Sequence, residues 1–211
     1  SKYYETPNID RLASQGMKLT NYHQCQNCAP TRAALMSGQY GPRTGVYTVG
    51  GINRFDWQSR PLRPVDNVEA LPLSKITIAQ ALRSAGYATG MFGKWHLGQD
   101  VLHHPSRRGF DEAIVSNGRH FDFPTSPKVD YPPSTYLADF LTDKAVDFVR
   151  RHRQQPFFLY FAHTFPHRPL HVAPAFQGSS AGGLYGDVVQ ELDWSVGRVL
   201  EALDQGGLAA N

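Results

Sequence analysis

The sequence has few cysteines, little net charge and no long apolar run. Two cysteines among 211 residues, Cys25 and Cys28, cannot form the disulfide framework of a small secreted domain. A net charge of +3 is too small to indicate a nucleic-acid or membrane partner. No apolar stretch reaches the roughly 20 residues that a membrane-spanning helix needs. These absences favour an ordinary globular protein that binds neither nucleic acid nor membrane.

The composition supports this interpretation. Apolar residues make up 41% of the chain and charged residues 18%, as in typical globular domains. The first residues, SKYYETPNID, contain neither an initiator Met nor the pattern of a signal peptide. We therefore expect a processed chain or a piece of a longer one.

The apolar spacing predicts alternating helices and strands. Helical spacing and end signals occur in residues 6–16, 31–38, 77–86, 135–152 and 186–207. Residues 87–95 and 156–162 are predicted strands, and the second is expected to be buried on both faces. Residues 41–72 and 98–134 lack a sustained period and are predicted loops. The order predicts an α/β fold with a mostly parallel sheet flanked by helices.

The segment NCAPTRAALMSG places Cys28 at the start of a predicted helix that begins just after Pro30. The free amide groups and positive end of a helix N-terminus favour an anion. Arg32 lies one turn along and can reach back toward Cys28 with a permanently charged guanidinium group. These features suit a nucleophile, but a buried structural cysteine at a helix start remains an equally open alternative.

The segment GYATGMFGKWHLG ends in Lys94, Trp95 and His96. On an extended chain, residues i and i+2 share a face, so Lys94 and His96 are expected to point the same way while Trp95 packs behind them. The carboxyl end of a strand is also where α/β sheets bind ligands. A polar strand end on the surface remains the alternative.

The segment HTFPHRPLH follows the second predicted strand. Its histidines, His163, His167 and His171, have the i, i+4, i+8 spacing of a metal-binding helix face. Pro166 and Pro169 oppose a regular helix there, so the spacing is weak support for a zinc site. Surface or packing roles remain open for His163 and His171.

Two segments carry a family resemblance. CAPTRAALMSG resembles the sulfatase signature Cys-x-Pro-Ser/Thr-Arg followed by an apolar helix and Gly, and GYATGMFGKWHLG resembles the second sulfatase signature. TPNIDRLASQG, RRGFDE, PFFLYFAHTFPHRPL and YGDVVQELDWSVGRVLEALDQGGL resemble the segments that surround these signatures, in the same order. The resemblance implies that residues 1–211 are part of a sulfatase catalytic domain with an alkaline-phosphatase-like core. The first strand and the C-terminal part of that domain are missing, so a gap in the sheet is expected.

The resemblance also implies a chemistry. In this family a formylglycine-generating enzyme oxidises the signature cysteine, here Cys28, to Cα-formylglycine. The hydrated aldehyde is held by a divalent cation, usually Ca²⁺, and attacks the sulfur of a sulfate ester. By resemblance, Arg32 braces the formylglycine and Lys94 contacts the diol and the sulfate. His96 acts as a base, and His167 contacts the sulfate and the leaving oxygen.

Other family features have no counterpart in this chain. The implied metal ligands other than Cys28, which are two acidic pairs in the family, lie outside this sequence, and so does a further lysine. Asp66-Asn67 precedes a helix instead of following an apolar strand, so it is not expected to bind metal. His163 and His171 match no functional residue. The isolated chain is therefore expected to be inactive.

The resemblance favours hydrolysis of sulfate esters of small molecules or carbohydrates, in a periplasmic, secreted or lysosomal protein. A phosphonate or phosphodiester hydrolase of the same superfamily is an alternative, although GKWHLG favours the sulfatase. A redox or zinc module built on Cys25 and Cys28 is another, but it gives no role to Pro30 or Arg32.

Four aromatic residues are candidates either for stacking on a substrate ring or for packing. They are Trp57, Phe121, Phe123 and Tyr131.

Overall fold

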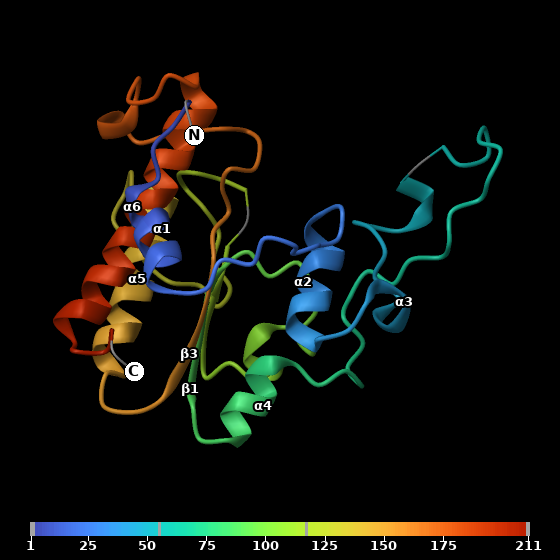
Figure 1. Cartoon of the computed structure of the whole chain (residues 1–211). Helices are drawn as coiled ribbons and strands as arrows, with labels where there is room; N and C mark the ends of the chain where they lie inside the picture. The colour runs from blue at the N-terminus through green and yellow to red at the C-terminus, as the bar shows by residue number, and fades with distance from the viewer. Residues whose placement is uncertain (1–2, 55, 117, 210–211) are drawn as a thin grey trace. The chain divides into compact units, whose positions relative to one another are not determined.

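The computed structural model describes residues 3–54, 56–116 and 118–209 (Figure 1). The chain divides into two compact units. Unit 1 comprises Ser1–Thr20, Gly90–Lys94 and Ala113–Asn211, and unit 2 comprises Asn21–Thr89 and Trp95–Glu112.

Unit 1 contains most of a three-stranded sheet and its helices. Its elements are α1 (Pro7–Gln15), β1 (Ala88–Gly93), β2 (Glu112–Val115), α5 (Leu137–Arg151), β3 (Phe157–Ala162), η3 (Pro174–Phe176) and α6 (Gly183–Gln205). The strands are parallel in the order β2-β1-β3, which confirms the predicted α/β class with a parallel sheet flanked by helices. β1 and β2 each begin with residues assigned to unit 2.

Helix α5 packs directly against β1. Gly90 makes this approach possible, because a Cβ atom there would lie 2.7 Å from the ring of Phe148. Phe92 meets the same ring edge-on, with centroids 5.9 Å apart. Helix α5 also contacts α6, and α6 contacts α1, so these three helices lie side by side (Figure 1). Val146, Ala202 and their neighbours are the buried residues of the α5–α6 contact.

Strand β3 differs from its prediction. Its first five residues are half-buried and only Ala162 is fully buried, whereas the apolar run predicted burial on both faces. The burial is lower than predicted because, among the described strands, β3 lies at an edge of the sheet. Strand β1 pairs directly with both β2 and β3, so the expected gap does not occur between these three strands.

Unit 2 consists of short helices joined by long connections. Its elements are α2 (Cys28–Ser37), α3 (Gly41–Thr44), η1 (Ile52–Arg54), α4 (Ile78–Ser84) and η2 (Pro105–Arg107). Helix α4 begins with a capping box, in which the Thr77 hydroxyl accepts from the amide of Gln80 and the Gln80 side chain accepts from the amide of Thr77. The Thr77 hydroxyl also donates to the carbonyl of Arg108 at 2.7 Å.

No helix in the described part of the chain is long and apolar enough to cross a membrane.

The two predicted loops contain short elements that the sequence did not reveal. Residues 41–72 include α3 and η1, and residues 98–134 include η2 and β2. Asn67 organises the first of these segments. Its Oδ1 accepts from the amides of Tyr47 (2.7 Å) and Thr48 (3.1 Å), and its Nδ2 donates to the carbonyls of Thr48 and Gly50. The Asn67 side chain therefore stabilises this loop through hydrogen bonds to its backbone.

Helix α2 begins three residues earlier than predicted. Its first residue is Cys28, so Pro30 lies inside the first turn, where a missing amide proton has no intrahelical cost. The helix ends as predicted at Gly38, whose φ of 63° is left-handed and whose amide donates to the carbonyl of Ala34. Cys28 is thus the first residue of the helix itself, whereas the sequence placed it before the helix.

Candidate active site

Cys28 and Arg32 occupy one side of the first turns of α2. The packing side of the helix is formed by Ala29, Ala33 and Met36, which are no more than 3% exposed. Cys28 and Arg32, four residues apart, lie off that side and are both half-buried. They therefore face away from the core of the helix contact, at the end where amide groups favour an anion.

The Thr31 hydroxyl connects the first turn of α2 to the residues that precede the helix. Its hydroxyl lies 2.7 Å from the carbonyl oxygen of Asn27 and 3.0 Å from that of Cys25. Cys25 thus contributes its backbone, and both cysteines are free thiols in the structure. The arrangement ties the chain before Cys28 to the first turn without using either sulfur.

Lys94 follows directly after β1 and is tied to the end of β3. Its amide donates to the carbonyl of Ala162 at 2.7 Å. The preceding residue must be glycine, because Gly93 has a φ of 118° and a Cβ atom there would lie 1.9 Å from the same carbonyl oxygen. The carboxyl ends of β1 and β3 therefore meet at one edge, and the loop that carries His167 starts from that edge.

The geometry of His96 differs from the expected extended segment. Strand β1 ends at Gly93, and His96 has a φ of 63°, in the left-handed region. The premise of that prediction, an extended segment from Lys94 to His96, is therefore wrong, and the shared direction of the two half-buried side chains stays a prediction. The expectation for Trp95 is confirmed, since it is 2% exposed and meets Phe110 edge-on at 5.9 Å. Left-handed residues other than glycine gather at functional sites, where the surrounding structure holds them.

His167 lies exposed on the loop between β3 and η3. Its Nδ1 is 2.7 Å from the carbonyl oxygen of Arg168. Because a carbonyl only accepts hydrogen bonds, Nδ1 must carry the proton, and Nε2 is the nitrogen that can face a substrate. The loop thus sets the tautomer of His167.

His163 has a packing role, one of the two alternatives left open for it. Thr142 donates its hydroxyl proton to the carbonyl of Ala138, so it accepts from the Ser195 hydroxyl at 2.6 Å. Ser195 in turn accepts from Nε2 of His163 at 3.1 Å. Burial lowers the pKa of His163 to about 3, so the ring is neutral. His163 therefore links the end of β3 to α5 and α6.

His171 also packs, against an aromatic group. Its ring centroid lies 5.2 Å from that of His120, 5.3 Å from Tyr136 and 5.0 Å from Phe121. Burial, and secondarily the charge of His120, lower the pKa of His171. The described part of the chain contains no group of three or more His, Cys, Asp or Glu side chains placed to hold a metal ion. The three-histidine arrangement is therefore not formed.

The four aromatic candidates separate into two kinds. Phe123 is 2% exposed and stacks on Tyr131 with centroids 4.1 Å apart, and the Tyr131 hydroxyl donates to the Phe123 carbonyl. These two rings pack on each other, and both also line a pocket, so contact with a substrate stays open for the half-buried Tyr131. Phe121 is 39% exposed, and Trp57 is half-buried with Arg63 over its ring. Phe121 and Trp57 remain candidates for substrate contact.

The predicted site residues divide between the two units. Cys28, Arg32 and His96 belong to unit 2, and Lys94 and His167 belong to unit 1. Sequence reasoning missed the residues that hold the Lys94–His96 segment, above all Arg108. The signal available was its place in RRGFDE, which suggested a family segment and no role.

The sequence matches known proteins along its whole length. The profile of the Sulfatase family matches residues 1–211. N-acetylgalactosamine-6-sulfatase of Sus scrofa is 34% identical over 235 residues, covering 98% of this chain and 44% of that protein. Steryl-sulfatase of Mus musculus is 30% identical, covering 99% of this chain and 46% of that protein. The chain thus spans about half the length of these relatives.

Solved structures agree with these matches. The crystal structure of Ps i-CgsB in complex with k-i-k-neocarrahexaose has a TM-score of 0.83 at 28% identity, covering 99% of this chain and 51% of that one. The structure of PsFucS1 sulfatase from Pseudoalteromonas sp. shares the fold, with a TM-score of 0.76 at 22% identity over 98% of this chain and 48% of that one. From the profile match over all its residues, this chain belongs to the sulfatase family.

Proposed function

We propose that this chain is part of an enzyme that hydrolyses sulfate esters, with a Cα-formylglycine formed from Cys28. The observation that carries the proposal is the position of Cys28 as the first residue of α2, with Arg32 one turn along. The amide groups at that end of the helix have no intrahelical acceptors and favour a sulfate anion. The helix and the guanidinium group thus provide positive charge where a sulfate ester has to bind.

The other site residues supply distinct functions. Formylglycine, when formed, supplies a hydrated aldehyde whose oxygen serves as the nucleophile. Lys94 and Nε2 of His167 are proposed to bind the sulfate oxygens and the leaving oxygen, and Arg32 to brace residue 28. His96 is proposed to accept a proton as a base. Fixed positive groups that face the developing charge of the sulfate lower the barrier to cleavage of its S–O bond.

The sulfatase family generally uses Ca²⁺ with the formylglycine. The described residues include no cluster of carboxylate, histidine or cysteine side chains that fits a hard divalent cation, which prefers six to eight oxygen ligands. Residue 28 in its hydrated form is the one ligand proposed from this chain. The remaining ligands are proposed to lie outside it.

The proposed substrate is a sulfated small molecule or carbohydrate. In support, two relatives are named for N-acetylgalactosamine-6-sulfate and steryl sulfate hydrolysis, and one similar structure was solved with a neocarrahexaose. We further propose a formylglycine-generating enzyme as partner, and a periplasmic, secreted or lysosomal location.

A mass spectrum tests the modification. Trypsin releases residues 19–32, which contain both cysteines, from protein made together with a formylglycine-generating enzyme. Formylglycine in its aldehyde form is about 18 Da lighter than cysteine, whereas a Cys25–Cys28 disulfide removes only about 2 Da. Reaction with a hydroxylamine probe, and fragment ions that place the loss at residue 28, would support the proposal. A disulfide or an unmodified peptide would contradict it.

A further inference from the structure

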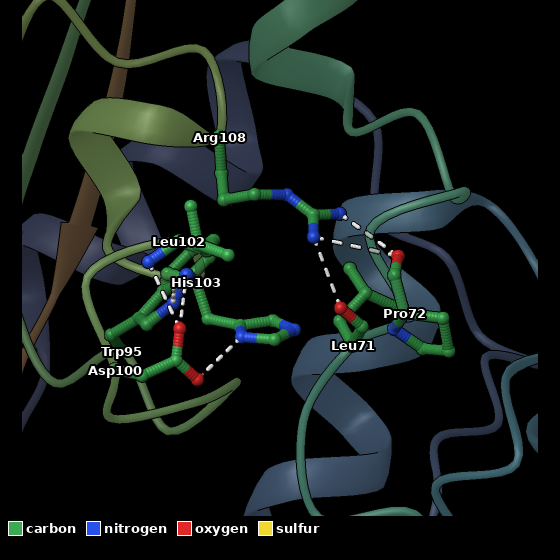
Figure 2. Close-up of polar contacts among 7 residues, drawn as sticks. All are labelled: Leu71, Pro72, Trp95, Asp100, Leu102, His103 and Arg108. Carbon is green, nitrogen blue, oxygen red and sulfur yellow. Dashed lines mark hydrogen bonds and ion pairs between the residues drawn. The ribbon is translucent and has the colours of Figure 1, made fainter.

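Arg108 is a buried arginine with an unusual set of partners. It is 2% exposed, and burial lowers its pKa. Its Nη1 donates to the carbonyl of Leu71 at 3.0 Å (Figure 2). Its Nη2 donates to the carbonyl of Lys75 at 2.7 Å. Both nitrogens also lie 3.3–3.4 Å from the carbonyl oxygen of Pro72. The planar guanidinium group thus holds three backbone carbonyls in a fixed arrangement.

A further hydrogen bond connects the segment that Arg108 holds to the backbone beside His96, the candidate base. The amide of Leu71, whose carbonyl is held by Arg108, donates to the carbonyl of Leu97 at 3.1 Å. Leu97 directly follows His96, the residue with a left-handed φ of 63°. The carbonyl of Arg108 itself accepts from the Thr77 hydroxyl at 2.7 Å, which fixes the arginine at its backbone end. One continuous set of hydrogen bonds therefore joins Arg108 to the backbone beside His96.

The other side of His96 is held as well. The Trp95 indole nitrogen donates to the carbonyl of His103 at 2.8 Å. Asp100 accepts from the amides of Leu102 and His103 and contacts Nδ1 of His103 at 2.6 Å (Figure 2). Gly98, with a φ of 126°, packs so closely that a Cβ atom would lie 2.3 Å from that of His103. The chain is therefore held on both sides of His96.

We propose that Arg108 is a positioning residue that keeps His96 in its left-handed conformation. A non-glycine residue at positive φ is strained and persists only where its surroundings over-determine it. A buried charge is costly unless hydrogen bonds satisfy it. Nε of Arg108 has no partner among the described residues, so Nη1 and Nη2 satisfy the charge through backbone carbonyls, and one of these belongs to Leu71, whose amide donates to Leu97. The link from Arg108 to His96 stands on the described contacts alone. Its effect on turnover rests on the proposed sulfatase function.

The test compares Arg108→Met, Arg108→Lys and a matched control, Arg107→Met, in the full-length protein. Arg107 carries the same charge on the adjacent residue but is exposed. Amide hydrogen exchange at Leu71 measures the hydrogen bond to Leu97 directly. The amide of Gly38, which donates to Ala34 in α2 at 2.8 Å, reports on general opening of the fold. Steady-state kinetics with an aryl sulfate give kcat and KM.

In Arg108→Met, exchange at Leu71 is expected to become at least about tenfold faster while Gly38 is unchanged. We expect kcat and kcat/KM to fall together by roughly 10- to 100-fold, because misplacement of a base acts in the transition state. Arg107→Met should match the unmodified protein. Arg108→Lys keeps the charge without the planar fork, so it should show a smaller change in both measurements.

Unchanged exchange at Leu71 in Arg108→Met would overturn the positioning role, and so would a loss of rate that equals the loss in Arg107→Met. If Arg108→Met does not fold, Arg108→Lys decides, and wild-type exchange together with wild-type kcat in that variant would overturn the proposal. If the unsubstituted protein hydrolyses no sulfate ester, the proposed function fails, whereas the exchange measurement still decides the role of Arg108.

Discussion

The hydroxyl of Tyr136 donates a hydrogen bond to the carboxylate of Glu191 at 3.1 Å in the interior of unit 1. Glu191 is 0% exposed, and its burial raises its pKa from the ordinary 4.5 to about 7, although the bond from Tyr136 acts in the opposite direction. The amide of Ala173 lies 3.4 Å from the same carboxylate. The pair joins α6 to the residue before α5 and to the segment that follows His171.

This relationship predicts that stability depends on pH. Because the folded state holds the Glu191 proton more tightly than the unfolded state, the stabilisation is complete below about pH 4.5 and is lost as pH rises through about 7. The shift corresponds to at most roughly 3 kcal/mol. His163, whose pKa burial lowers to about 3, acts in the opposite direction between pH 5 and pH 8, so the Glu191 contribution is measured as the change in urea-denaturation stability from pH 5 to pH 8 relative to that of Glu191→Gln.

Glu191→Gln is the matched control, since the amide keeps the shape and cannot ionise. Relative to the unsubstituted protein, the stability of this variant at pH 8 compared with pH 5 should rise by the Glu191 contribution. An equal difference in both proteins would show that other groups cause the pH dependence.

A second prediction separates the two cysteines. Cys28→Ala should abolish turnover of an aryl sulfate by the full-length protein, because it removes the precursor of the nucleophile. Cys25→Ala should keep most of the activity, because the structure uses the Cys25 carbonyl, which the substitution retains. The assay is initial rate at saturating substrate. An active Cys28→Ala protein beside an inactive Cys25→Ala protein would reverse the assignment.

A third prediction separates the histidines by the kind of loss. His96→Ala and His167→Ala should each lower the rate by roughly two to four orders of magnitude, as expected for the loss of a general acid or base. His163→Ala removes the ring that donates to Ser195, so it should lower the midpoint of thermal unfolding. Its rate per folded molecule should fall far less than in the other two variants. Equal rate losses at His163 and His167 would instead indicate a shared histidine metal cluster.

The sequence predicted the fold class because helical periodicity and apolar strands are local patterns. It missed β2, whose four residues, Glu112–Val115, are too few to show a period. It also overestimated the burial of β3, because an apolar run does not reveal whether a strand has a neighbour on both sides. Strand neighbours depend on contacts between distant parts of the chain.

The same contrast between local patterns and distant contacts applies to the candidate site. Motif spacing identified Cys28, Arg32, Lys94, His96 and His167 as candidates, and their roles remain proposals. The conformation of His96 was mispredicted as extended because positive φ is uncommon outside glycine, and the several-fold enrichment of histidine there is too weak to locate one left-handed residue. Arg108 was overlooked because a buried arginine and an exposed one, such as Arg107, read alike in a sequence. Only three-dimensional contacts distinguish them.

The last prediction concerns the 211-residue chain by itself. The described residues offer no cluster of metal ligands, so the chain should bind Ca²⁺ more weakly than micromolar affinity in a calorimetric titration. The half-buried apolar residues of β3 lie at a sheet edge, and exposed apolar edges promote aggregation. We therefore expect the chain, made with a formylglycine-generating enzyme, to be prone to association and to hydrolyse an aryl sulfate far more slowly than the full-length protein. Micromolar Ca²⁺ binding, or turnover near the full-length rate, would show that this chain holds the cation site itself.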